Sequence, residues 1–261
     1  MKDYKVSIFP RSRIATNDVC AVGLKKHHIV AMIEVDVKES REKIQLSKAN
    51  DHKISFTAWL IKVISSTIKD YENAASYLKG KRKLLVFDDI NVSVAVEKKL
   101  NDQKVPIPLI VEKADSRSIE SITRQLDDAR NQVLSDKDIV LQNKSNRLEL
   151  LYYYLPGFLR RSFWRYLLRH PRYAFGKMGN VAITSLGMVG NVNGWFVPIS
   201  VHPICFGIGK VIKKPVVHND QIAIREILNM TVLLDHDIID GGQMARFISD
   251  LTANIEKGRG L

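Results

Sequence analysis

The sequence predicts one α/β domain in which a mixed β-sheet is flanked by helices, mainly on one side. Strand-like segments with alternating apolar residues and helix-like segments with an apolar stripe both occur along the 261 residues. The strand-like segments gather late in the chain and do not alternate strictly with helices, which argues against a doubly wound parallel sheet. Because no flexible linker or break in composition divides the chain, residues 1–261 are expected to form a single domain.

The first two predicted elements are a strand and a helix. Ile29–Val37 has apolar residues at alternate positions with acidic residues between them, as in a half-buried strand. Ser55–Tyr71 has an apolar residue at every fourth position, at Leu60, Ile64 and Ile68, and this spacing predicts a helix with one buried face.

Two strands and a second helix are predicted next. Ile90–Glu97 alternates like a strand. Val105–Val111 is also strand-like, but its two prolines cannot donate ladder hydrogen bonds, so it is expected at a sheet edge or a bulge. Ser116–Arg130 has helical spacing, and either Ser116 or Ser118 is placed to cap its N-terminus.

The C-terminal half predicts two more helices with several strands between them. Gly157–His170 is a predicted helix rich in arginine, and Pro171 is expected to end it. A last helix follows Gly241 and Gly242. The segments with a strand pattern are Val181–Ser185, Ile204–Ile212, Gln221–Glu226 and Leu228–Leu234.

The composition restricts the location and the kinds of site. The two cysteines, Cys20 and Cys205, cannot build a disulfide framework, and no run of about 18 apolar residues exists, so a cytoplasmic protein without membrane spans is expected. No His, Cys, Asp and Glu residues have metal-ligand spacing, so neither a metal nor a bound cofactor is predicted.

The net charge of +12 indicates an anionic partner. Such a charge suits a nucleic acid, an anionic membrane or a phosphorylated substrate, and nucleic acid ranks last because no binding motif occurs. Residues 151–177 hold six cationic and no acidic residues, which is half of the excess charge, together with nine aromatic residues.

The most informative motif is Asp235–Gly242, with the sequence DHDIIDGG, at the end of a predicted strand. In one interpretation Asp240 merely caps the last helix and His236 is an ordinary loop histidine. In the other, His236 is a general base, because an imidazole can take a proton from a thiol, hydroxyl or amine as it attacks a carbonyl. The spacing alone favours the first interpretation.

The surrounding chain favours the second interpretation. Residues 235–241 resemble the D-H-R-V-x-D-G signature in the catalytic domain of the dihydrolipoyl acyltransferases of 2-oxoacid dehydrogenase complexes, a family that shares its fold with chloramphenicol acetyltransferase. Residues 182–190, AITSLGMVG, resemble the family's T-I-S-N-L-G-M-x-G, and 196–199 and 214–217 resemble its F-T-P-I and K-P-V-V. The resemblance is collinear, strongest over 180–257 and weaker over 54–130.

The resemblance implies a homotrimer with a site shared between subunits. In the family the histidine deprotonates the acceptor, which attacks an acyl thioester, while a hydroxyl of the neighbouring subunit stabilises the oxyanion. The alignment places that hydroxyl on Thr184, with the adjacent Ser185 as the alternative. Asp240 matches a carboxylate that pairs with an early arginine, here Arg11 or Arg13 at the substrate site. Coenzyme A is then a co-substrate that enters between subunits.

We therefore predict a stand-alone acyltransferase that takes an acyl group from coenzyme A or an acyl carrier protein. No lipoyl-bearing domain precedes the matching region, and Asp237 replaces the family's arginine, so the acceptor is left open as a thiol, hydroxyl or amine. The alternative hypothesis is a catalytically idle homologue that assembles with acyltransferase partners.

The basic and aromatic segment within 131–178 has two interpretations. It is either a helix packed on its own subunit, with aromatics in the core and arginines in solvent, or a surface beside the acyl-donor entrance. On a Gly157–His170 helix, Leu159, Phe163, Tyr166 and Leu167 would share one face and Arg161, Arg165 and Arg169 another. Such faces suit an anionic membrane or an acidic carrier protein.

Overall fold

A computed structural model of the protein describes residues 4–7, 9, 11–49, 53–71, 73–80, 82–100, 103–132, 152–186 and 193–261. The helices are α1 (Arg11–Gly23), α2 (Lys38–Ala49), α3 (Phe56–Lys69), α4 (Ile119–Asn131), α6 (Gly157–Arg169), α7 (Pro171–Met178) and α8 (Gly241–Glu256). The strands are β1 (His28–Asp36), β2 (Tyr77–Lys79), β3 (Lys83–Leu85), β4 (Val92–Leu100), β5 (Gln103–Val111), β6 (Val181–Ser185), β7 (Ile204–His218) and β8 (Gln221–Asp235).

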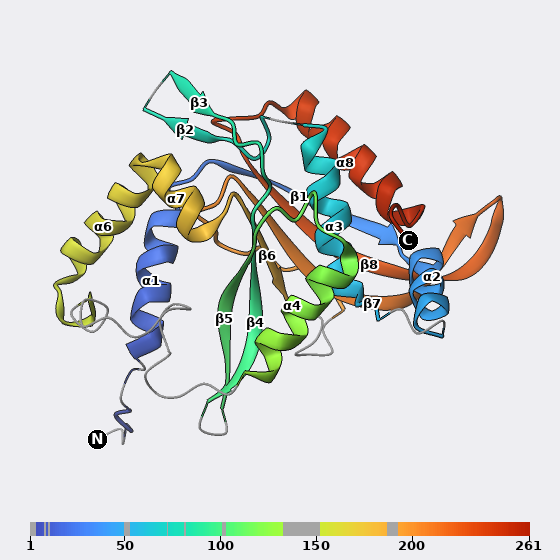
Figure 1. Cartoon of the computed structure of the whole chain (residues 1–261), viewed down its shortest axis with the longest axis horizontal. Coiled ribbons are helices and arrows are strands. Elements are labelled where there is room, and N and C mark those ends of the chain that lie inside the picture. The colour runs from blue at the N-terminus through green and yellow to red at the C-terminus, as the bar shows by residue number, and fades with distance from the viewer. Residues whose placement is uncertain are drawn as a thin grey trace.

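Six strands form one mixed sheet in the order β1-β8-β7-β6-β4-β5, and β2 and β3 form a separate hairpin (Figure 1). β6 runs parallel to both β4 and β7, and the other pairs are antiparallel. β5 lies at the edge of the sheet, which confirms the expectation drawn from its two prolines.

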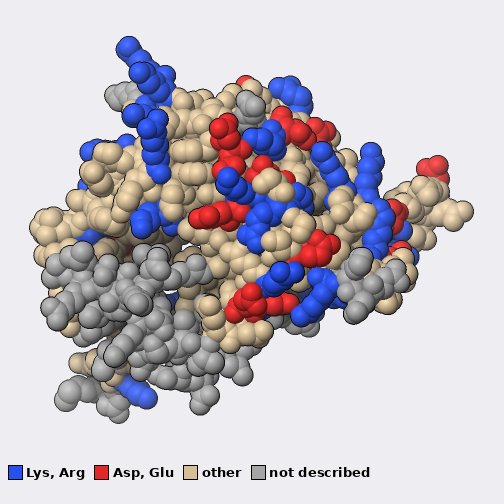
Figure 2. Space-filling view, in the orientation of Figure 1, with Lys and Arg blue, Asp and Glu red and all other residues tan. Residues whose placement is uncertain are grey.

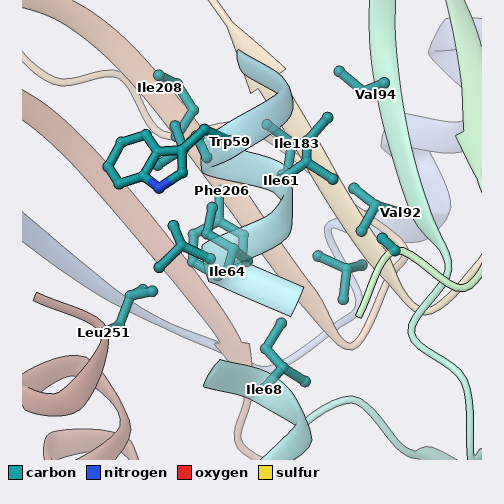
Figure 3. Packing of buried hydrophobic residues seen from close by; sticks show 14 of the residues in the cluster. Trp59, Ile61, Ile64, Ile68, Val92, Val94, Ile183, Phe206, Ile208 and Leu251 are labelled. Atoms are coloured by element: carbon teal, nitrogen blue, oxygen red, sulfur yellow. The ribbon is translucent and has the colours of Figure 1, made fainter. Parts of the chain in front are cut away.

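Helices α2, α3, α4 and α8 cover one face of the sheet and enclose the main core (Figure 1). Buried side chains of α3, among them Trp59, Ile61 and Ile64, pack against Ile183 and Phe206 of the sheet (Figure 3). The buried indole of Trp59 also donates a hydrogen bond to the carbonyl of Arg259, 3.1 Å away, so that burial leaves no polar atom of the ring unpaired. We call this side of the sheet the helical face.

The opposite face, which we call the open face, is crossed by residues 193–200. The crossing is close, because a side chain at Gly207 would meet the carbonyl oxygen of Phe196 at 3.0 Å. Trp195 fixes the segment near β1 by donating to the carbonyl of Ile33 at 2.9 Å. Val30 and Met32 of β1 remain exposed beside it.

Helices α1, α6 and α7 form a separate group at one edge of the molecule (Figure 1). Asp18 of α1 is buried and joins α1 to α6. It forms an ion pair with Arg160, at 2.6 Å from its Nε, and accepts a hydrogen bond from Tyr152 at 2.9 Å. Leu167 and Ala174 of this group pack with Tyr77 in a second, smaller core.

The structure corrects several details of the sequence prediction. Pro171 does begin a break after α6, but it is also the first residue of α7, where its missing N–H costs nothing. The two strands expected over Gln221–Glu226 and Leu228–Leu234 are the single strand β8. Helices α1 and α2 and the β2–β3 hairpin were not predicted. Among the described residues, no helix is long and apolar enough to cross a bilayer.

Candidate functional site

His236 lies in the turn that joins β8 to α8. The turn is closed by the N–H groups of Ile238 and Ile239, which donate to the carbonyl of Asp235 at 3.0 and 3.2 Å. Ile239 is buried and anchors the turn in the core. The His236 side chain is exposed, and within the described residues its ring has no hydrogen-bond partner. The imidazole therefore contributes little to this fold and is available to a substrate or a second subunit.

The segment between α1 and β1 contacts this turn and holds it in place. The N–H of His236 donates to the carbonyl of His27 at 2.9 Å. Lys26 forms an ion pair with Asp235, whose side chain is almost completely buried. A buried carboxylate needs such a partner, because removing either charge alone would leave the other uncompensated. The sequence analysis missed this pair, whose two residues are 209 positions apart.

The pKa values of the neighbouring histidines are shifted in different directions. The charge and hydrogen bond of Asp237, whose Oδ1 lies 3.0 Å from Nδ1 of His27, raise the pKa of His27. Burial lowers the pKa of His28, and it lowers that of His202 to about 4. Nε2 of His202 lies 3.0 Å from the carbonyl of Met178, so this nitrogen carries the proton and donates it. His28 and His202 are therefore neutral, structural histidines at pH 7.

Asp240 caps helix α8. Its Oδ1 accepts a hydrogen bond from the N–H of Gln243 at 2.8 Å, and its own backbone is extended. Asp240 is thus a helix cap, which is compatible with either role of His236, and the cap fixes where the turn that carries His236 ends. No ion pair joins Arg13 to Asp240 in the part of the chain that the structure describes, and the side chain of Arg11 lies outside it.

Thr184 and Ser185 lie side by side on β6 and point to opposite faces of the sheet. Val181 and Ile183 are buried against the helices, so Ser185 lies on the helical face and Thr184 on the open face. Thr184 pairs with Gly207, over which Phe196 and Pro198 pass. Its hydroxyl is therefore at the margin of the segment that crosses the open face.

Ser185 belongs to a cavity of about 280 Å³ between the sheet and helices α3 and α4. Ile61, Val94, Ile183 and Ile208 line this cavity and are labelled in Figure 3. Arg41, Arg130 and Lys210 also contribute to its wall. The two predicted oxyanion donors therefore lie in different environments.

A single subunit does not bring His236 to Thr184. Thr184 pairs with Gly207, which pairs with Thr231, and His236 follows Thr231 by five residues along β8. At about 3.4 Å per residue along a strand and about 4.8 Å between strands, the two Cα atoms are on the order of 20 Å apart. Acyl transfer needs both groups within hydrogen-bond reach of one reacting carbonyl.

The described residues gather no three His, Cys, Asp or Glu side chains as a metal site. What the site offers is an exposed imidazole on a fixed turn and a hydroxyl on the open face. Both groups belong to a mixed sheet that is covered by helices on one face.

The chain belongs to the family of 2-oxoacid dehydrogenase acyltransferase catalytic domains, whose model matches residues 21–140 and 176–261. It is similar to the dihydrolipoyllysine-residue acetyltransferase component of the pyruvate dehydrogenase complex of Rickettsia prowazekii, with 26% identity over 88% of this chain and 48% of the relative. The chain thus spans about half the length of the curated relatives it matches. Residues 141–175, which include α6, are unmatched by the family model.

Solved structures confirm the fold. The cubic core of the pyruvate dehydrogenase multienzyme complex and the dihydrolipoamide acetyltransferase of Azotobacter vinelandii each superpose with a TM-score of 0.68 at 17% identity, over 99% of this chain and 93% of theirs. Chloramphenicol acetyltransferase superposes with a TM-score of 0.50 at 9% identity, over 96% and 95%. The resemblance found in the sequence and the predicted fold class are both confirmed.

Proposed function

We propose that the protein transfers an acyl group from a thioester of coenzyme A, or of a carrier protein, to a thiol, hydroxyl or amine, with His236 as the general base. The observation that carries this proposal is the placement of His236. Its backbone is fixed by His27 and by the Lys26–Asp235 pair, whereas its ring is exposed and makes no hydrogen bond within the described residues. Membership of the family supports the same assignment.

The reaction follows from these groups. The imidazole of His236 removes the proton of the acceptor X–H as X attacks the thioester carbonyl, which forms a tetrahedral oxyanion. A hydroxyl donor stabilises that oxyanion. When the intermediate collapses, the C–S bond breaks and the leaving thiolate takes the proton from the imidazolium. The products are the acylated acceptor and a free thiol, and the histidine returns to its neutral state.

We assign the oxyanion donor to Thr184 rather than Ser185. Thr184 faces the open side of the sheet, whereas Ser185 lines the cavity on the helical face. In the Azotobacter vinelandii enzyme, a serine, a histidine and an asparagine have been investigated for their roles in catalysis. The histidine follows the serine by 52 residues, and the asparagine follows the histidine by four. Thr184, His236 and Asp240 have the same two separations. Asp240 would act by positioning the turn through its cap on α8.

We propose further that the site is shared between subunits of a homotrimer. The separation of about 20 Å within one subunit supports this, because only a second copy can complete the site. Uncovered apolar surface is available for such contacts. Val217, Ile222 and Ile224 are exposed on one side of the β7–β8 hairpin, where it extends past α2 (Figure 1). On the open face, buried side-chain oxygens of Asn229 and Thr231 have no partner in the described chain.

The decisive variant is His236→Ala. It should abolish acyl transfer to a small thiol acceptor without changing the circular dichroism spectrum, because the base is lost and an exposed side chain is removed. His170→Ala is the matched control, since it removes another exposed imidazole far along the chain, and it should retain activity. Turnover of His236→Ala within about threefold of the wild type would end the assignment. A folded wild type that is inactive with every thioester donor would favour the idle homologue.

A further inference from the structure

The unmatched helix α6 carries an exposed apolar strip that its own subunit does not cover. Phe158, Phe163 and Tyr166 are 62%, 47% and 56% exposed, and Leu159 is exposed beside them. Four residues were expected to share one face of this helix. Leu159, Phe163 and Tyr166 are exposed to solvent, whereas Leu167 is buried. The first of the two interpretations of this segment, in which its aromatics lie in the core, is therefore wrong for these residues. We call Leu159, Phe163 and Tyr166 the outer strip; the exposed Phe158 lies beside it, on the side of the helix that carries Arg165, seven residues further on.

A cationic row runs along the helix beside the outer strip. Arg161, Arg165 and Arg169 recur at four-residue spacing, and residues 152–178 contain no acidic residue. Arg165 and Arg169 are exposed and form no ion pair within the described residues. Figure 2 shows acidic and basic side chains that intermingle over the helical face, in contrast to this uniformly cationic helix.

The helix is also held firmly enough to present these side chains. Arg160 and Tyr152 both bind the buried Asp18 of α1, and the indole N–H of Trp164 donates to the hydroxyl of Tyr152 at 3.0 Å. These contacts occupy the inner face of α6. Arg161 also reaches Asp18, at 3.9 Å, whereas the outer strip, Arg165 and Arg169 are exposed to solvent. The exposed arrangement is therefore a consequence of specific packing.

We propose that α6 is a peripheral membrane-docking helix that lies on an anionic lipid surface. A helix with aromatic and aliphatic residues on one side and arginines along its flank is the pattern of interfacial helices, which insert their apolar side chains among the lipid headgroups. The arginines complement the negative surface of such a membrane.

A flat lipid surface fits the observations better than a protein partner. Aromatic anchors at protein interfaces fill shaped pockets. The outer strip stands on a single helix, and none of the residues that line the cavity belongs to α6. The proposal does not depend on the acyl-transfer reaction, since the family model leaves residues 141–175 unmatched.

Sedimentation of the full chain with lipid vesicles tests the proposal. The protein should sediment with vesicles of phosphatidylcholine and phosphatidylserine in equal parts and should stay in solution with phosphatidylcholine alone. Each cation near an anionic surface contributes about fivefold to binding, so Arg165→Gln with Arg169→Gln should weaken it roughly twenty-fivefold. Phe158→Ser with Phe163→Ser should weaken it as well, and high salt should remove the contribution of the arginines.

The matched control is Lys48→Gln with Arg124→Gln, which removes two exposed cations from α2 and α4 and should leave vesicle binding unchanged. Equal weakening by the control pair would show non-specific charge attraction and overturn the proposal, as would failure of the wild type to sediment. Binding of an acidic acyl carrier protein through the same arginines, without vesicle binding, would assign the surface to a protein. Dissociation of the oligomer by the serine variants, seen by light scattering, would assign it to a subunit contact.

Discussion

The neighbours Thr184 and Ser185 show how one position along a strand decides the chemistry available to a hydroxyl. Ser185 sits among apolar side chains of the helical face, whereas Thr184 lies on the open face beside Gly207. We expect an acyl group that reaches the sheet from a neighbouring subunit to meet the second position, on the face that the helices leave uncovered. The alternation of side chains along a strand makes the two positions mutually exclusive as oxyanion donors.

Substituting each residue separately should distinguish the two hydroxyls. Thr184→Ala should slow turnover about a hundred- to a thousandfold, which corresponds to about 2.7–4 kcal/mol of transition-state stabilisation. Thr184→Ser should recover most of that rate because it restores the donor, and Ser185→Ala should stay close to the wild type. Turnover and the circular dichroism melting curve are measured for all three. Severe loss in Ser185→Ala alone would show that our choice of face is wrong.

Local patterns predicted much of the site, but only where its residues are close in sequence. His236 and Asp240 stand in one motif, and the capping role of Asp240 follows from a carboxylate placed just before a helix. The Lys26–Asp235 pair and the His27–Asp237 contact could not be predicted in this way. They join the start of β1 to the end of β8, and that pairing depends on the register of the whole sheet.

At the scale of elements, strong periodicity was predictive and weak periodicity was not. Helices α3, α4 and α8 bury a clear apolar stripe, and all three were predicted. Helix α2 buries only Ser40 and Ile44, so its sequence carries little helical pattern. β8 was divided in two because its burial changes along its length, from exposed residues in the hairpin to buried residues in the core.

The attachment of α6 to α1 depends on one carboxylate. Asp18→Ala would leave Arg160 and Tyr152 partly buried without their partner, and loss of one member of such a pair typically costs about 3–5 kcal/mol. We expect the cost to appear as local detachment of α6, because Asp18 binds Arg160 and Arg161 of α6 and Tyr152 just before it. Hydrogen exchange should become faster for the amides of residues 157–169 and stay unchanged in α3.

Asp18→Asn is the matched variant for this experiment. It keeps an oxygen that can accept from Tyr152 but removes the charge that attracts Arg160. We expect an intermediate increase in exchange across α6. Unchanged protection of α6 in Asp18→Ala would show that the hydrophobic contacts of Leu167 and Ala174 with Tyr77 are sufficient to hold α6 and α7 in place.

At the scale of the whole molecule, the fold class was predicted from the elements themselves, whereas a site shared between subunits was predicted only from the family resemblance. The mixed sheet and its helical layer follow from the order and periodicity of the elements. The separation of about 20 Å between His236 and Thr184 follows only from the strand register, which places them two strands apart and five residues apart along the direction of β8. Symmetric association is the simplest way to bring the two groups together.

Mixing two inactive variants tests the shared site directly. His236→Ala subunits retain Thr184, and Thr184→Ala subunits retain His236, so a mixed trimer contains one interface in which both residues are intact. If the two proteins are produced together in equal amounts and assemble at random, about three quarters of the trimers are mixed, and each has one of its three sites restored. The mixture should therefore show about a quarter of the wild-type turnover, at a mass of about three times 29.7 kDa.

A third protein provides the control for this experiment. The control is the double variant, with both His236→Ala and Thr184→Ala, produced together with the single variant His236→Ala. These trimers have the same size but contain no intact His236, and they should remain inactive. Because every subunit of the active mixture lacks one of the two groups, recovered turnover can come only from a site that spans two subunits. Mixed trimers without activity, or a fully active monomer, would place the complete site within a single chain and contradict the distance that the strand register imposes.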